Sequence, residues 1–194
     1  MKDISNNRFV FIDTETGGTI PEKHSLLSIG LVVWDSNKGK IDEKELYVKH
    51  DIYIVTKEAQ KINKFNEDYH NKIAENPDIV IKSMLSFLRT YFPEDVFIPL
   101  AGHNVNFDIN FLKVFLKSQN RSYNQYFSHR IIDTYSVYKT LILSGLISEN
   151  LNSSHDAFSY FGIKVSERHN ALSDCRATVD LYEKMLLTIR NGGF

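Results

Sequence analysis

The sequence predicts a mixed α/β fold in a single domain that spans residues 1–194. Strand-like segments joined by a short turn fill the first quarter of the chain, and short apolar strands then alternate with helical patterns. The length of 194 residues and the hydrophobic fraction of 42% fit one globular domain with a substantial core. Because neither a repeat nor a low-complexity linker divides the sequence, we expect one sheet flanked by helices.

Three strands form the first part of the predicted sheet. Arg8–Thr14 contains a continuous apolar run, which is typical of a strand buried on both faces. A second strand is expected over Leu26–Trp34, and the turn-forming residues 37–40 lead to a third over Glu45–Val48. Because a short turn joins the second strand to the third, these strands are expected to run antiparallel.

The remaining predicted elements alternate between helices and short strands. One short helix is expected over Thr56–Phe65, and Asn76-Pro77 opens a longer one with apolar residues at helical spacing. Two further strands are expected, over Val96–Leu100 and at Ile131-Ile132. The other helices are expected over four segments: Asn104–Lys117, Thr134–Ser144, Ser153–Phe161 and Ala171–Arg190.

Charge and cysteine content narrow the class of protein. A net charge of −1 provides no global basic field, which argues against a tight, sequence-independent duplex binder. The single cysteine, Cys175, excludes an intramolecular disulfide and is expected to pack beside Asp174 rather than to react. An apolar signal stretch is missing from the first residues and no run is long enough to span a bilayer, so we expect no membrane partner and a cytoplasmic location.

Four carboxylates and one histidine fall in three short motifs. These are D-x-E at 13–15, H-N-x-x-F-D at 103–108 and H-x-A-x-x-D at 169–174. In a chain of this composition the first motif is expected by chance about 0.7 times, but the second and third only about 0.003 and 0.015 times. His155 starts a similar H-x-A pattern, yet Tyr160 stands where the acid is required.

Acidic motifs with a histidine indicate metal-dependent phosphodiester hydrolysis. Asp13 and Glu15 lie two residues apart at the end of a strand, so both point to the same face and repel unless a cation neutralises them. Four carboxylates balance two divalent cations, and their oxygen atoms favour Mg²⁺ or Mn²⁺. A neutral histidine titrates near pH 6.5 and can accept a proton from water, a role we expect for His169.

The three motifs resemble those of the DEDD superfamily of 3′–5′ exonucleases, in the DEDDh branch whose third motif carries histidine. That branch includes proofreading subunits of bacterial replicative polymerases, ribonuclease T and oligoribonuclease. The resemblance implies a ribonuclease-H-like fold and a two-metal site. It implies that Asp13 bridges both ions, that Glu15 and Asp174 complete the nucleophile-side site, and that Asp108 supports the leaving-group side.

Other residues near the first motif are candidates for substrate contact. The resemblance places Thr14, Thr16 and Gly17 at the terminal nucleotide, although a glycine pair at 17–18 can equally form a turn. Most basic residues are scattered and are expected to be solvated surface. Arg168, next to the motif histidine, is the one candidate for a phosphate contact.

Two alternatives are open for the residues of the second motif that precede Asp108. His103 and Asn104 either reach the substrate or brace the turn before the helix. Phe107 either stacks on a base or packs in the core, and the core is favoured because a phenylalanine at a helix start is more often buried. Asp133-Thr134 is interpreted as a helix N-cap rather than as part of the site.

The leading interpretation is an exonuclease that releases nucleoside 5′-monophosphates from single-stranded 3′ ends, with DNA favoured. The alternatives are an enzyme for RNA ends or short oligoribonucleotides, and an accessory protein that binds a polymerase. The chain ends soon after its last helix, which favours a free-standing enzyme. A homodimer is also open, because Tyr123, Tyr126 and Phe127 either form an interface or cover the core.

Overall fold

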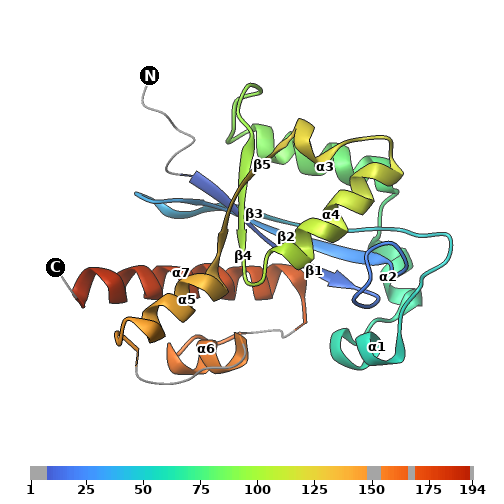
Figure 1. Cartoon of the computed structure of the whole chain (residues 1–194). Coiled ribbons are helices and arrows are strands. Elements are labelled where there is room, and N and C mark those ends of the chain that lie inside the picture. Colours follow the sequence, from blue (N-terminus) through green and yellow to red (C-terminus); the bar gives the residue numbers. More distant parts are fainter. Residues whose placement is uncertain (1–7, 148–153, 166–168, 193–194) are drawn as a thin grey trace.

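A five-stranded mixed sheet forms the centre of the computed structural model, which describes residues 8–147, 154–165 and 169–192 (Figure 1). The strand order is β3-β2-β1-β4-β5. Neighbouring strands are antiparallel among β1, β2 and β3, whereas β4 and β5 run parallel to β1. The strand bounds are β1 Arg8–Thr16, β2 Leu26–Asp35, β3 Gly39–Tyr47, β4 Ile98–Gly102 and β5 Phe127–Asp133.

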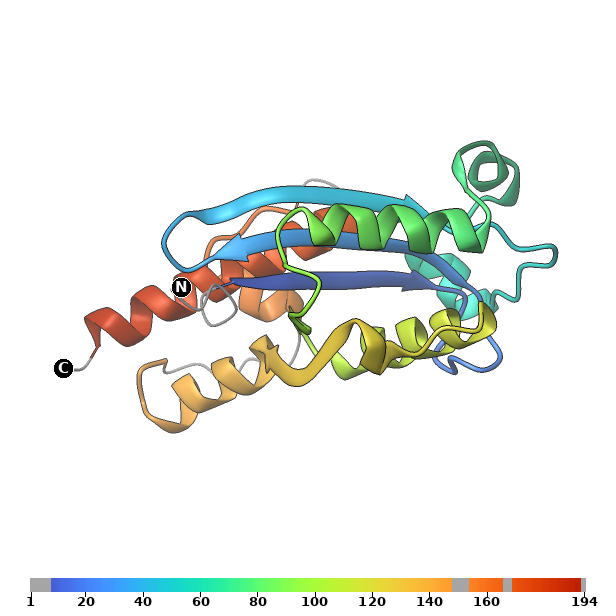
Figure 2. The ribbon, with the colours of Figure 1, turned by 90° about the horizontal axis from the view of Figure 1, so that it is seen from above.

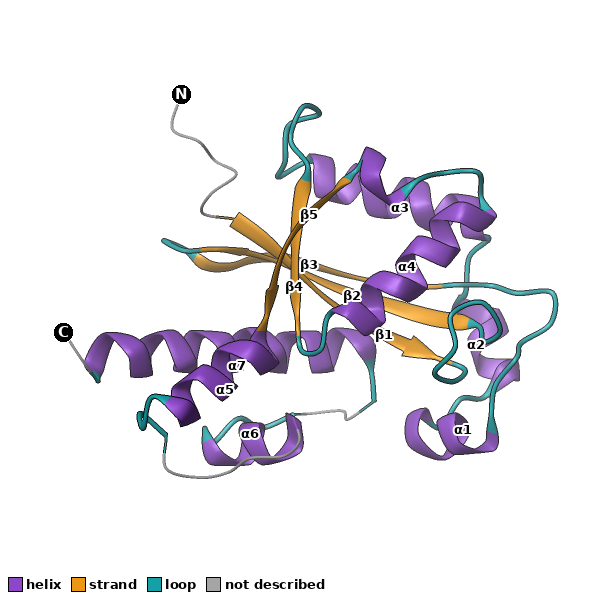
Figure 3. Ribbon diagram, in the orientation of Figure 1, coloured by secondary structure: helices purple, strands orange, loops and turns teal. Residues whose placement is uncertain are grey.

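Helices cover both faces of this sheet (Figure 3). On one face α3 and α4 pack against the sheet, and α5, α6 and α7 pack on the other. Helices α1 and α2 lie beyond the end of β1 (Figure 1). The helix bounds are α1 Lys57–Asn63, α2 Glu67–Ile73, α3 Pro77–Arg89, α4 Asn106–Ser118, a 3₁₀ turn at Tyr123–Gln125, α5 Thr134–Leu143, α6 Ser154–Tyr160 and α7 Ala171–Asn191. These observations confirm the predicted α/β class and its ribonuclease-H-like order of elements.

Strand β1 is buried on both faces, as its continuous apolar run predicts. Val10 and Ile12 belong to the core beneath α3 and α4, whereas Phe11 belongs to the core beneath α7. Because successive side chains of a strand point to opposite faces, Asp13 follows Phe11 onto the α7 face. Thr14 follows Ile12 onto the α4 face. The alternation therefore places Asp13 and Thr14, which are adjacent in the first motif, on opposite faces of the sheet.

Several predicted boundaries differ from the observed ones. Strand β3 begins at Gly39 rather than at Glu45, because a tight hairpin pairs Asp35 with Gly39 (Figure 2). The helix expected over Thr56–Phe65 is α1, which ends at Asn63 because Lys64 takes a left-handed conformation (φ 53°), and a second helix, α2, follows it. The missed helix α2 carries a recognisable start signal, because the Asn66 side chain caps it by accepting from Tyr69 N–H.

The later elements shift by smaller amounts. Strand β4 lies two residues later than the expected Val96–Leu100, and β5 extends well before Ile131-Ile132. The first residue expected for α6, Ser153, lies outside the described residues. No helix in the described part of the chain has the length and apolar character needed to cross a membrane.

The aromatic residues offered as an interface mostly cover the core instead. Tyr123 and Phe127 are buried, and their rings stack with centroids 5.0 Å apart. Tyr126 is partly buried against the same core. This placement removes the sequence argument for a homodimer through these three residues.

A buried histidine joins α2 to the sheet. His70 Nε2 lies 3.1 Å from the Val48 carbonyl oxygen, so the ring donates a proton to that acceptor. Its ring packs against Tyr53 and Phe65, with centroids 5.3 and 5.2 Å away. Burial lowers the pKa of His70 below its ordinary value, because the charged ring would lose its hydration among aromatic neighbours.

We therefore predict that His70 makes the protein less stable in mild acid. Its folded pKa is lowered, so the unfolded state binds the proton first and stability falls as the pH drops below about 6.5. Melting temperatures of wild type and His70→Phe at about pH 7.5 and about pH 5.5 test this. The wild type should lose more stability than the variant, and an equal loss in both proteins would contradict the prediction.

Candidate active site

The first motif lies in the last part of the central strand β1. Asp13 and Glu15 are both half-buried and occupy alternate positions on the face that α7 covers. The sequence predicts that they lie at the end of the strand, whereas β1 continues to Thr16. Across the sheet Asp13 pairs with Gly30 of β2, which in turn pairs with Glu45 of β3.

The third motif brings a carboxylate and a histidine to the same face. Asp174 lies in the first turn of α7, and His169 lies just before that helix. Ligand atoms of Glu15, His169 and Asp174 all lie within 4.8 Å of one another, which makes this trio a candidate metal site within the described residues. The backbone N–H of His169 donates to Asp174 Oδ2 over 3.0 Å, so a hydrogen bond also connects these two motif residues.

Asp108 reaches the site from the opposite layer and is only 5% exposed. It lies in the first turn of α4, and the Thr14 hydroxyl donates to its Oδ1 over 2.6 Å. Burial raises the pKa of Asp108 to about 7, although the Thr14 hydrogen bond acts in the opposite direction. A cation beside this carboxylate would stabilise its charged form.

The buried thiol of Cys175 lies at the start of α7, directly after Asp174. Burial raises its pKa most, and the negative charges of Asp13 and Asp108 raise it further. Asp13 and Asp108 do not belong to the trio within 4.8 Å. The thiol itself is fully buried, which confirms the expectation that it packs in the core.

Gly30 allows the start of α7 to approach the sheet. A Cβ atom at this position would lie 2.3 Å from the Ala171 carbonyl oxygen and 2.6 Å from the Leu172 nitrogen. Since both are backbone atoms, neither can turn aside as a flexible side chain would. The first turn of α7 therefore lies directly over Gly30, between Asp13 on β1 and Glu45 on β3.

The residues expected to contact the substrate at the first motif form hydrogen bonds within the chain. Thr14 is bonded to Asp108, and the Thr16 hydroxyl donates to the Gly18 carbonyl over 2.7 Å. Gly17 donates its N–H to Ser25 O and accepts from Thr56 N–H, both over 2.7 Å. These residues therefore tie the end of β1 to the segment before α1.

The residues that flank the second motif brace the turn before α4. His103 Nδ1 lies 3.0 Å from the Thr134 hydroxyl, and burial lowers its pKa. The Asn104 N–H donates to Asp133 Oδ1 over 3.1 Å. Asp133 also accepts from Tyr135 N–H over 2.9 Å, as expected of the N-cap of α5.

Phe107 does not pack in the core as the sequence analysis favoured. It is 38% exposed on the first turn of α4, although its ring contacts Phe111 with centroids 5.1 Å apart. The helix turns Asp108 toward Thr14, which leaves the preceding side chain on the solvent side. Phe107 is thus accessible to a ligand. Arg168 lies outside the described residues.

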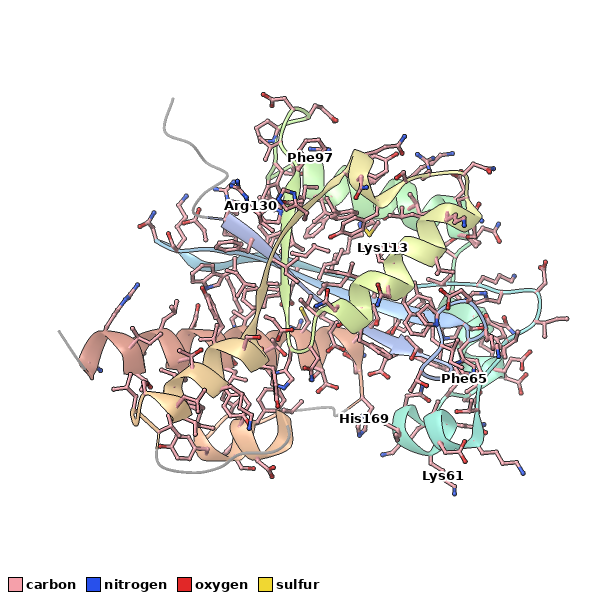
Figure 4. All side chains as sticks on the ribbon, viewed as in Figure 1. Lys61, Phe65, Phe97, Lys113, Arg130 and His169 are labelled. Atoms are coloured by element: carbon pink, nitrogen blue, oxygen red, sulfur yellow. The ribbon has the colours of Figure 1, made fainter. Side chains whose placement is uncertain are left out.

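The donor set fits hard divalent cations. Carboxylate oxygens dominate it, and the imidazole of His169 is the single nitrogen donor in the trio. A cavity of about 390 Å³ opens beside these groups. Figure 4 shows His169 at the start of α7, on the side of Phe65 and Lys61. The cavity is lined by Glu15, His169 and Asn170 on one side and by Asn63, Lys64, Phe65 and Tyr69 on the other.

We predict that Thr14 positions Asp108 through its hydroxyl. Thr14→Val removes the donor but keeps the shape, so it should destabilise the protein by roughly 1–3 kcal/mol and reduce turnover. Thr14→Ser keeps the hydroxyl and should retain most of both. Chemical denaturation and initial rates provide the measurements, and a valine variant that matches wild type in both would contradict the assignment.

We further predict that Gly30→Ala moves the start of α7 away from Glu15. The added methyl group should cost roughly 1–3 kcal/mol of stability and a much larger share of activity. Gly145→Ala is a matched control, because it strains a positive φ of 74° yet meets no heavy atom within 4 Å. That control should lose stability without losing turnover. Equal activity in the two variants would be inconsistent with the prediction.

Comparison with known proteins agrees with this arrangement. The family model RNase_T, described as an exonuclease, matches residues 10–182. DNA polymerase III subunit epsilon of Treponema pallidum is 27% identical over 92% of this chain and 76% of its own length. A PolC-type DNA polymerase III from Caldanaerobacter subterraneus is 27% identical over 95% of this chain, which covers only 12% of that protein.

A solved structure shows the same fold. Escherichia coli exonuclease I in complex with a dT13 oligonucleotide superposes with a TM-score of 0.77 at 20% identity. The match covers 95% of this chain and 41% of that one. The family model extends from β1 into α7. The first and third motifs, which lie near the two ends of this match, lie together in space. This chain therefore belongs to the RNase_T exonuclease family.

Proposed function

We propose that this protein is a metal-dependent 3′–5′ exonuclease of the DEDDh type. It hydrolyses phosphodiester bonds at the 3′ end of single-stranded nucleic acid and releases nucleoside 5′-monophosphates. The observation that carries the proposal is the convergence of Glu15, His169 and Asp174 within 4.8 Å, in a chain of an exonuclease family. Asp13 and Asp108, which is buried in the opposite layer, are proposed to complete the acidic set.

Two divalent cations, Mg²⁺ or Mn²⁺, are proposed to bind to the carboxylates. Asp13, Glu15, Asp108 and Asp174 would hold them, and the four negative charges match the charge of two such ions. When bound, the ions neutralise charge in the transition state and make water a better nucleophile. His169 serves as the general base, because it belongs to the trio and a neutral imidazole can accept the proton of the attacking water.

The substrate is proposed to be single-stranded DNA. The cavity beside Glu15 and His169 has room for a strand terminus, and exposed Phe107 offers an aromatic face at the second motif. The matched exonuclease I structure contains a dT13 oligonucleotide, and the matched relative is named as a DNA polymerase III subunit. RNA ends or short oligoribonucleotides remain the alternative substrates.

Two further proposals concern partners and location. Similarity to a polymerase subunit and to a PolC-type polymerase supports an association with a polymerase. The alternative of a homodimer stays a prediction. A cytoplasmic location is supported by the single buried cysteine, which suits a reducing compartment.

A strand-shortening assay tests the proposed activity. With 5′-labelled single-stranded DNA and matched RNA, we expect a ladder that shortens from the 3′ end with Mg²⁺ or Mn²⁺ and disappears with EDTA. Asp13→Ala should abolish cleavage in folded protein, whereas Asp51→Ala, an exposed acid outside the motifs, should not. Cleavage that survives EDTA, or that is unchanged in Asp13→Ala, would refute the proposal. The faster of the two substrates assigns DNA or RNA.

The role of His169 has its own prediction. His169→Ala should lower turnover by roughly 10²–10⁴-fold, which is the usual contribution of a general base. Initial rates between about pH 5.5 and about pH 8.5 provide the measurement. A near-wild-type rate in the variant would exclude this role.

A further inference from the structure

A row of polar contacts joins β3 to α7 along the edge of the sheet. One contact lies near each end of the row and one in the middle. At the far end Lys40 Nζ lies 2.7 Å from Asp180 Oδ1, and in the middle Arg176 Nε donates to Glu43 Oε2 over 2.7 Å. The contact nearest the active site differs from these ion pairs, because Asn170 Nδ2 donates to Glu45 Oε1 over 2.8 Å.

The Asn170 side chain forms hydrogen bonds with both α7 and β3. Its side-chain oxygen accepts from Ser173 N–H over 2.9 Å and so caps α7. Its amide nitrogen is left to bind β3 through Glu45. Tyr47 lies beside this contact, and burial is the main cause of its raised pKa, followed by the Glu45 carboxylate.

The bond from Asn170 to Glu45 therefore links the start of α7 to β3 through side chains. Glu45 and Tyr47 alternate along β3, so they lie on the same face of the sheet. That face is the one on which Gly30 meets the start of α7. Glu45 and Asn170 are both half-buried, which strengthens their hydrogen bond relative to a bond in bulk water.

The Asn170–Glu45 contact lies next to a strained residue of the site. His169 directly precedes Asn170, and its backbone has a φ of 66°, in the left-handed region. This conformation is strained for a residue other than glycine, so surrounding contacts must maintain it. The contacts in the described structure are the His169 N–H bond to Asp174 and the attachment of the next residue to β3.

We propose that Glu45 is a positioning residue, which holds His169 and Asp174 against Glu15 by anchoring Asn170 to β3. The inference rests on the proposed function, since it concerns the placement of the proposed base. Glu45 lies outside the three motifs. Loss of the Glu45 carboxylate frees the Asn170 amide but leaves the cap of α7 intact, so the helix remains while the orientation of His169 relaxes.

The expected effect is on turnover rather than on substrate binding. Glu45→Ala should lower kcat by about tenfold or more, because displacements of about 1 Å at a catalytic group cost up to about 10²-fold. KM should change little. Glu45→Gln retains an oxygen that accepts from Asn170, so it should recover most of the lost kcat. Lys40→Ala is the matched control, since it breaks the contact at the far end of the same row.

Steady-state rates on single-stranded DNA, with melting temperatures for each variant, test the inference. We expect kcat to fall in Glu45→Ala and to stay at the wild-type value in Lys40→Ala, with similar small losses of stability. Equal kcat in these two variants would overturn the proposal. Asn170→Ser keeps a side-chain oxygen that can cap α7 but lacks the amide N–H that reaches Glu45, so it should also lower kcat. An unchanged kcat there would overturn the proposal even if Glu45→Ala fails to fold.

A second readout separates this inference from the proposed activity. The imidazole NMR signals of His169, assigned with His169→Gln, should shift in Glu45→Ala but not in Lys40→Ala. Signals that do not move in Glu45→Ala would overturn the positioning role. An inactive wild type, with the predicted shift still present, would instead refute the exonuclease proposal and leave the positioning role standing.

Discussion

The close approach of the Glu15 and Asp174 carboxylates, which lie with His169 within 4.8 Å, is the constraint on which the proposed site depends. Groups of like charge at short range raise one another's pKa and drive their elements apart unless the fold and a cation hold them. Here the four carboxylates of the motifs come from the central strand and from one helix on each face of the sheet. Two apolar cores fix those elements, so hydrophobic packing supplies the stability that opposes the repulsion.

Close approach of α7 to the sheet is the second requirement of the proposed site. It depends on a missing side chain in β2 and on polar side chains in β3. The missing side chain at Gly30 lets the first turn of α7 lie over β2. Polar side chains of β3 then fix that turn along the edge of the sheet. On the opposite layer the Thr14 hydroxyl fixes Asp108 and partly offsets the rise in pKa that burial causes.

The sequence predicted the mixed sheet and the acidic motifs because both depend on short-range patterns. Strand alternation placed Asp13 and Glu15 on one face, and rare motif spacing identified Asp108, His169 and Asp174. The roles of Gly30, Glu45 and Thr14 could not be predicted, because each depends on a partner far away in the chain. Phe107 was assigned to the core for the same reason, since only the observed orientation of α4 decides which side chain of its first turn is buried.

Calorimetric titration with Mn²⁺ tests the central claim, that these carboxylates form a cation site, more directly than any rate. The account predicts binding to wild type that weakens at least about tenfold in both Asp13→Asn and Asp174→Asn, because each removes a charged oxygen ligand. Asp51→Asn, which changes an exposed acid outside the motifs, should bind as wild type does. Absence of binding to folded wild type, or equal binding in all four proteins, would contradict the account.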